Sequence, residues 1–152
     1  MKRKWKIILF IAMYVIALAI NLIVSVMFPD LRIEVFHFIA SILLFIVLIF
    51  VITQTARFTN WFLIAGAVSS CFVAFAQHFE ELLTSNWALD MLSGIQYPLY
   101  VIFNTPLFGL NYIFGFLPGS FALLCAGLFT FLFVIAKLFT WLVKKKSVLH
   151  VT

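Results

Sequence analysis

The stretch at residues 95–119 reads IQYPLYVIFNTPLFGLNYIFGFLPG, and it decides the topology of the chain. It carries no charged residue and is long enough to cross a membrane, for which a helix needs about 20 apolar residues. Pro98, Pro106, Asn104 and Asn111 nevertheless interrupt it. Whether this stretch crosses or turns back fixes the side of the membrane on which the rest of the chain lies.

The composition indicates an integral membrane protein. Of the 152 residues 66% are hydrophobic and 10% are charged, whereas soluble domains are about half apolar and a quarter charged. The net charge of +5 does not indicate nucleic-acid binding, because the basic residues lie at the ends of apolar runs. Cys71 and Cys125 lie inside such runs and are interpreted as small packing residues.

Besides the opening stretch, the chain has four apolar runs of membrane-spanning length. We expect them to form helices over about 7–28, 35–52, 61–79 and 120–143. The predicted fold is therefore an all-α integral membrane protein, with residues 1–152 in a single transmembrane domain.

The first run also has features of a signal peptide, because it follows the basic start MKRKWK and contains the motif Ala17-Leu18-Ala19. The run continues to Phe28 without a polar break, so cleavage there would leave a new end inside the hydrocarbon. We expect an uncleaved anchor.

Basic residues predict the orientation. With four crossings and a cytoplasmic N-terminus, Arg32 is the one basic residue placed outside. Positive charge favours the cytoplasmic side, and the residues that carry this signal are Lys2, Arg3, Lys4, Lys6, Lys144, Lys145 and Lys146. A full crossing at 97–117 would move the second cluster outside. We therefore expect both termini in the cytoplasm of a plasma membrane, and residues 95–118 as a re-entrant or interfacial helical hairpin on the outer side.

The opening stretch also has local start and stop signals. Thr105-Pro106 is a typical helix start, with threonine as cap and proline in the first turn, and Pro118-Gly119 is a typical stop. We expect two short helices, near 96–104 and 106–117. Tyr97, Tyr100, Asn104 and Asn111 fall within about 60° on a helical projection. They form a candidate recognition stripe.

A second candidate site lies at the predicted outer ends of the second and third runs. Glu34 and His37 are spaced i, i+3, as are His78 and Glu81 in mirrored order. Residues at this spacing share a helix face, and imidazole with carboxylate suits zinc or iron. The sequence therefore allows a metal- or proton-linked site here, although polar residues are also common where apolar runs end.

Inside the first run, Asn21 and Ser25 lie four residues apart and are expected to face and hydrogen-bond other helices.

In His37-Phe38, and in Asn104 followed by Gly109, the chain is loosely similar to the small teicoplanin-resistance membrane family. The acidic, glutamine and basic positions expected beside them do not line up, so nothing is carried over from it.

The function predicted from these features is contact with other molecules and not catalysis. No Ser-, metal- or phosphate-binding motif of the common enzyme classes occurs, and no cofactor is indicated. We expect an accessory subunit or an immunity/protection factor in a membrane of bacterial type. Its partners would be the lipid bilayer and another membrane protein or further copies of itself. The alternatives are a small oligomeric transporter or channel, and an outward-facing metal- or proton-linked site or enzyme.

Overall fold

The computed structural model describes residues 2–52, 56–79, 91 and 94–149, and this part of the chain is helical and without strands. Four of its helices are long: α1 (Lys2–Met27), α2 (Val35–Ile52), α3 (Ala56–His78) and α8 (Pro118–Leu149). Within the described residues, these four are long and apolar enough to span a membrane. The predicted multi-pass membrane protein with four spanning helices is confirmed in this respect.

The spans agree closely with the apolar runs. The membrane-compatible windows are Lys4–Met27, Val35–Ile52, Thr59–His78 and Pro118–Trp141. The helices α1 and α8 extend beyond the apolar runs into the basic clusters, because lysine and arginine are good helix formers and the apolar core already fixes the helix.

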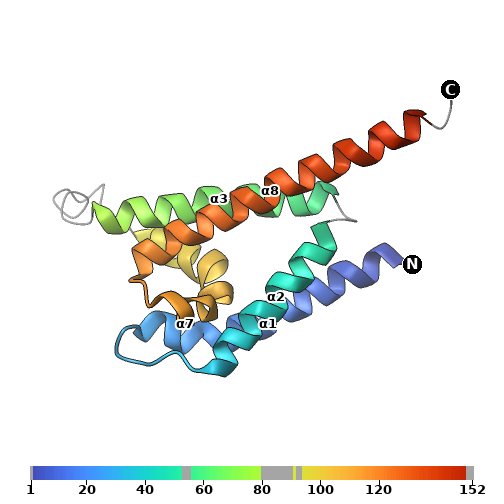
Figure 1. Cartoon of the computed structure of the whole chain (residues 1–152). Helices are drawn as coiled ribbons and strands as arrows, with labels where there is room; N and C mark the ends of the chain where they lie inside the picture. The colour runs from blue at the N-terminus through green and yellow to red at the C-terminus, as the bar shows by residue number, and fades with distance from the viewer. Residues whose placement is uncertain (1, 53–55, 80–90, 92–93, 150–152) are drawn as a thin grey trace.

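The long helices form two pairs, α1 with α2 and α3 with α8 (Figure 1). Residues 96–114, which we call the linking segment, pack between the pairs. The segment consists of α6 (Gln96–Leu99), η1 (Tyr100–Asn104), η2 (Thr105–Leu110) and α7 (Asn111–Phe114). Helix η2 packs on α1 and α2, whereas α6 and η1 pack on α3. The segment is therefore part of the bundle and joins its two halves.

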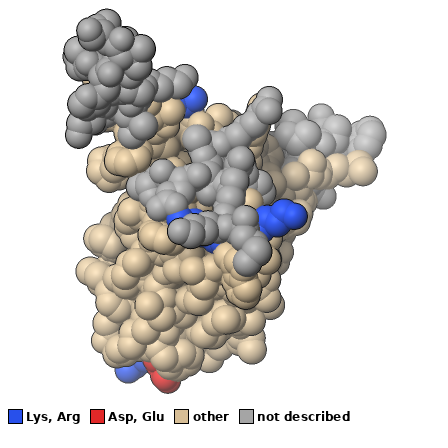
Figure 2. Space-filling view, turned by 90° about the vertical axis from the view of Figure 1, so that its right-hand side faces the viewer, with Lys and Arg blue, Asp and Glu red and all other residues tan. Residues whose placement is uncertain are grey.

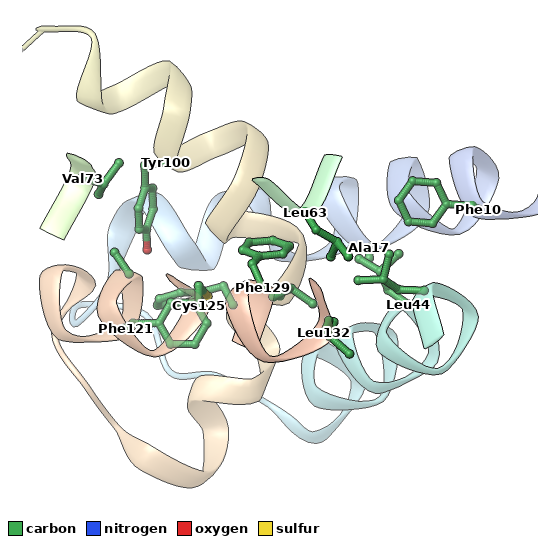
Figure 3. Packing of buried hydrophobic residues seen from close by; sticks show 14 of the residues in the cluster. Phe10, Ala17, Leu44, Leu63, Val73, Tyr100, Phe121, Cys125, Phe129 and Leu132 are labelled. Atoms are coloured by element: carbon green, nitrogen blue, oxygen red, sulfur yellow. The ribbon is translucent and has the colours of Figure 1, made fainter. Parts of the chain in front are cut away.

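The core between the pairs is aromatic and aliphatic. Figure 3 shows the α8 side of this core together with Tyr100 of the linking segment and residues of α1, α2 and α3. Phe108 of η2 is fully buried and packs edge-to-face on Phe121 of α8, with ring centroids 5.1 Å apart. On its other side Phe108 meets Phe28 at 5.5 Å. This one side chain therefore connects the linking segment to both helix pairs.

Charges lie at the two ends of the bundle. Figure 2 shows basic side chains in the upper half of the view, both signs at the lower edge, and an uncharged surface between. The N-terminal end of α1 and the C-terminal end of α8 lie at the same end of the molecule (Figure 1). An even number of crossings requires this arrangement.

In the linking segment the first predicted helix, near 96–104, agrees with the helical turns of α6 and η1, whereas the second, near 106–117, was wrong at its C-terminal end. Between residues 96 and 114 the chain passes from α-helix to π-helix to 3₁₀-helix and back to α-helix without an extended break. The segment ends at Phe114, because Gly115 adopts the left-handed conformation (φ 61°) that commonly terminates helices. Pro118 begins α8 and does not end a helix, since its fixed φ suits a first helical position.

Candidate functional site

Pro106 determines which backbone groups of the linking segment need outside partners, because it has no N–H. In an α-helix the N–H of residue 106 would bond to the carbonyl oxygen of Ile102. Here the hydroxyl of Tyr14 in α1 donates a hydrogen bond to that carbonyl. The Pro106 carbonyl accepts hydrogen bonds from Ser41 Oγ at 3.1 Å and from Asn21 Nδ2 at 3.4 Å. Side chains of α1 and α2 therefore satisfy the backbone around the proline.

Ser41 is the point where α1, α2 and η2 meet. While its hydroxyl donates to Pro106, its oxygen accepts from the Gly109 N–H at 3.0 Å and from Asn21 Nδ2 at 3.1 Å. A hydroxyl has one donor and two acceptor positions, so all three are used. Gly109 lies so close to α2 that a Cβ there would be 1.9 Å from the His37 carbonyl oxygen. The close approach of η2 to α2 therefore requires glycine at position 109.

The junction between η1 and η2 is bonded to both helix pairs. Ser70 Oγ of α3 donates to Asn104 Oδ1 at 2.8 Å. Thr105 Oγ1 lies 3.0 Å from Ser25 Oγ of α1. These four side chains are buried. The predicted cap at Thr105 was wrong, because η2 has no side-chain cap and the threonine hydroxyl is directed to α1 instead.

The sequence prediction that Asn21 and Ser25 face other helices is confirmed by these bonds. Tyr14 and Ser41 were missed. Tyr14 lies seven residues before Asn21 and so shares its helix face, and Ser41 is the one polar residue between Phe38 and Ile52. At both positions the sequence pattern indicates a side chain that faces other helices. Their hydrogen-bonding partners could be identified only from the three-dimensional structure.

The four residues of the predicted recognition stripe differ in accessibility. Tyr97 is 57% exposed, whereas Tyr100, Asn104 and Asn111 are 6% exposed or less. Asn111 closes the turn after α7, because its Nδ2 donates to the Phe116 carbonyl at 2.7 Å and its Oδ1 accepts from the Phe116 N–H at 2.8 Å. Only Tyr97 of the four presents most of its side chain to the surroundings.

The Glu/His candidate site is distributed over separate elements. His37 is buried at the start of α2, and its Nδ1 accepts a hydrogen bond from the Glu34 backbone N–H at 3.1 Å. The Nδ1 atom of His37 is therefore occupied by the backbone in this structure. His78 is exposed at the end of α3, and Glu81 lies outside the described residues.

In the part of the chain that the structure describes, no group of three or more His, Cys, Asp and Glu side chains could hold a metal ion. The helix α2 packs on α1 and η2, whereas α3 packs on α8, so the two histidines belong to different helix pairs. The structure does not bring Glu34, His37 and His78 together, and the metal- or proton-linked site stays a prediction.

No protein-family model matches the chain, and no curated protein or solved structure matches it either. The site is therefore interpreted from its own geometry.

A hollow of 360 Å³, which we call the α6 hollow, lies beside α6 at the end of the bundle opposite the termini. Its walls come from the ends of α1, α3 and α8, from α6 and η1, and from Leu117 just before α8. The lining side chains are Ser25, Val26, Gln77, Gln96, Tyr97, Tyr100, Leu117 and Pro118. Amides, hydroxyls and apolar groups are mixed in this lining.

Unpartnered polar atoms concentrate near the linking segment. Among the described residues, the buried side-chain atoms without a hydrogen-bond partner are Asn21 Oδ1, Asn60 Oδ1, Gln96 Oε1, Tyr100 OH and Asn104 Nδ2. Buried polar groups in folded proteins nearly always have partners. Gln96 and Tyr100 also contribute to the lining of the α6 hollow, but their unpartnered atoms are themselves buried, and the Tyr100 hydroxyl points toward Cys125 of α8 (Figure 3).

Proposed function

We propose that this chain is a multi-pass plasma-membrane protein of bacterial type that works by contact with another membrane component, as an accessory subunit or protective factor, and not by catalysis. The observation that carries the proposal is the linking segment, where a π-helix is followed directly by a 3₁₀-helix. Such irregular helices are uncommon and are frequent at functional sites.

The polar side chains of the spanning helices support this proposal, because they form hydrogen bonds to the linking segment. Tyr14, Asn21, Ser41 and Ser70 bond to the linking segment, and Ser25 does so through Thr105. Polar groups in a membrane interior are expensive and are typically kept for a purpose. Here they hold an irregular segment in one position, as a scaffold holds a recognition element.

We infer that the linking segment is re-entrant. It begins at the end of the bundle opposite the termini, extends inward to the Asn104–Thr105 junction, and returns to the same end (Figure 1). Its backbone needs partners inside the bilayer, since irregular backbone is tolerated there only when it is buried in protein. The hydrogen bonds from α1, α2 and α3 meet that requirement.

The orientation we propose puts both termini in the cytoplasm. Lys4 and Lys6 in α1 lie at the same end of the bundle as the lysine-rich end of α8, and clustered basic residues favour the cytoplasmic side. Trp5 and Trp61 are exposed at this end, as in an aromatic belt. The α6 hollow and Tyr97 then face outward.

Tyr97 is the proposed contact residue of the recognition stripe. Its ring is 57% exposed, and it lies on α6, which packs against α3. Tyr100, Asn104 and Asn111 would act behind it by fixing the position of the segment. Tyrosine is common at interfaces because its ring is apolar and its hydroxyl can bond to a partner.

Site-directed photo-crosslinking in intact membranes tests the proposal. A photoreactive phenylalanine analogue replaces Tyr97, and the same analogue at Phe131, a 59% exposed side chain on α8, is the control. We expect a protein adduct of one defined mass from position 97 and none from position 131. A chain that gives no protein adduct at 97, and that is always alone and monomeric after mild detergent extraction, would overturn the proposal.

A further inference from the structure

A second hollow, which we call the Arg32 hollow, lies where the connection between α1 and α2 meets α7. It is lined by residues 32–36, Ile39 and Tyr112. Its volume of 690 Å³ is within the range of about 300–1,000 Å³ that ligand pockets occupy. The α7 helix lies beside the start of α2 (Figure 1), and the Tyr112 ring packs on Phe38 of α2 with ring centroids 5.9 Å apart. Two elements that lie far apart in the sequence therefore form the hollow.

One side chain of each charge sign lines this hollow. Arg32 and Glu34 are both exposed, and neither has an ion-pair partner among the described residues. A guanidinium group binds phosphate through paired N–H bonds, and a carboxylate accepts hydrogen bonds from an ammonium group. The two side chains therefore suit a ligand that carries both a phosphate and an ammonium group.

The spacing of the two charges limits the size of the ligand's polar part. Residues 32–34 lie between helices, and residues two apart in a chain have Cα atoms no more than about 7 Å apart. The opposite charges of the ligand must therefore lie only a few bonds from each other. In phosphoethanolamine a short carbon link joins the phosphate to the ammonium group, so Arg32 and Glu34 can contact both groups at once.

An apolar row leads away from the hollow along α2. Phe36 and Ile39 line the hollow, and Leu43, Ile46 and Phe50 continue the same row at helical spacing. All five side chains are exposed. Because α2 is long and apolar enough to span the membrane, this row lies against the hydrocarbon. A lipid with its headgroup in the hollow therefore has a place for an acyl chain along α2.

We propose that the Arg32 hollow binds a phospholipid whose headgroup carries both a phosphate and a primary ammonium group, as in phosphatidylethanolamine. Arg32 binds the phosphate, Glu34 accepts hydrogen bonds from the ammonium group, and an acyl chain lies along the row that begins at Phe36. This inference goes beyond the proposed function and does not depend on it, because the hollow does not include Tyr97 and lies at an end of the bundle whichever end faces the cytoplasm.

Photo-crosslinking of the full chain in lipid nanodiscs tests the proposal. A photoreactive phenylalanine analogue replaces Phe36, and the nanodiscs contain equal amounts of phosphatidylethanolamine, phosphatidylglycerol and monoglucosyl diacylglycerol with the same acyl chains. The second lipid has the phosphate without the ammonium group, and the third has neither. Mass spectrometry of the adducts gives the ratios of the three lipids. The matched control is the analogue at Phe114, which is exposed on α7 and does not line the hollow.

The adduct ratios at positions 36 and 114 are the measured quantities. We expect phosphatidylethanolamine to exceed each of the other two lipids by a ratio at least about threefold higher at position 36 than at position 114, the factor that one favourable exposed ion pair supplies. A smaller difference between the two positions, a preference for either other lipid at position 36, or an adduct there that joins two copies of the chain would overturn the proposal.

Two charge-removing variants assign the roles at position 36. Arg32→Gln should lower the ratio of phosphatidylethanolamine to glucolipid at least about threefold, because the phosphate loses its cation. Glu34→Gln should lower the ratio of phosphatidylethanolamine to phosphatidylglycerol by a similar factor, because the ammonium group distinguishes these two lipids. The matched control is Asp30→Asn, which removes an exposed charge outside the hollow and should leave both ratios unchanged.

Misfolding does not explain the expected changes in the variants. The Arg32 and Glu34 side chains are exposed, and the hydrogen bond from Glu34 to His37 Nδ1 comes from the backbone N–H, which glutamine keeps. Each measurement is also a ratio within one sample, so a lower yield of folded protein does not alter it. An unchanged ratio in either variant would refute the proposal. A negative photo-crosslinking result at Tyr97 would leave this lipid test unaffected, so the two proposals fail separately.

Discussion

Replacing Gly109 with alanine should disrupt the packing of η2 on α2. The added Cβ would lie 1.9 Å from the His37 carbonyl oxygen and 2.6 Å from Ser41 Oγ, whereas ordinary contacts begin at 3.4 Å. Helix η2 must therefore retreat by about 1.5 Å, and α2 cannot yield easily because the nearest atoms belong to its backbone.

The size of the effect follows from what the retreat breaks. The Gly109 N–H lies 3.0 Å from Ser41 Oγ, and the Pro106 carbonyl oxygen lies 3.1 Å from the same atom. Two hydrogen bonds are worth about 1 kcal/mol each, and overpacking adds about 1–3 kcal/mol. We expect the free energy of unfolding to fall by about 3–5 kcal/mol.

The measurement is reversible unfolding in mixed micelles with increasing sodium dodecyl sulfate, followed by tryptophan fluorescence. Gly127→Ala is the matched control, because Gly127 lies within α8 and a Cβ there meets nothing within 4 Å. That variant should be as stable as the wild type or up to about 1 kcal/mol more stable, since alanine favours helix over glycine. A Gly109→Ala protein within about 0.5 kcal/mol of the wild type would refute the close packing of η2 on α2, since overpacking alone costs about 1 kcal/mol or more.

Tyr14→Phe should lower the free energy of unfolding by about 1–3 kcal/mol, because it removes the side-chain hydrogen bond to the Ile102 carbonyl; the same micelle assay measures this, and wild-type stability would count against that bond. The double variant His37→Ala, His78→Ala should contain as much zinc and iron as the wild type by elemental analysis, because His37 Nδ1 is already bonded to the Glu34 backbone. A lower metal content in the double variant than in the wild type would instead support the predicted metal site. Reporter fusions at the two ends of the chain should both report the cytoplasm. Fusions that place the two ends on opposite sides of the membrane would refute the proposed topology.

The four spanning helices could be predicted because their cause is local. A run of about 20 apolar residues needs only its own hydrogen bonds to be stable in a membrane, and the window Val35–Ile52 coincides with the predicted run. The even number of crossings followed from the two lysine-rich ends in the same way. These features depend on composition along the chain and not on which elements meet.

The linking segment could not be predicted in detail because its cause is tertiary. Thr105 before Pro106 has the local pattern of a helix cap, but its hydroxyl forms a hydrogen bond with Ser25 on α1 instead. The Pro106 carbonyl accepts a hydrogen bond from Ser41 on α2. Partners 65 or more residues away in the chain therefore outweighed the local preference, as is usual when a weak local signal competes with packing.

The Glu/His candidate site shows the limit of a spacing rule, which relates residues of one helix and not residues of two helices. The i, i+3 rule relates Glu34 to His37, and the two do interact, but through the backbone of Glu34. Whether a second pair approaches depends on which helices pack together. Here α2 pairs with α1 and α3 with α8, an arrangement that sequence spacing does not encode.

The hydrogen bonds to the linking segment also set an order for biosynthesis. Chains are made from the N-terminus, so α1, α2 and α3 are synthesised before residues 104–109. During that interval Asn21, Ser41 and Ser70 have no access to their later partners on Asn104, Pro106 and Gly109. The full set of bonds to these polar side chains therefore forms late in synthesis, after the first three helices have been made.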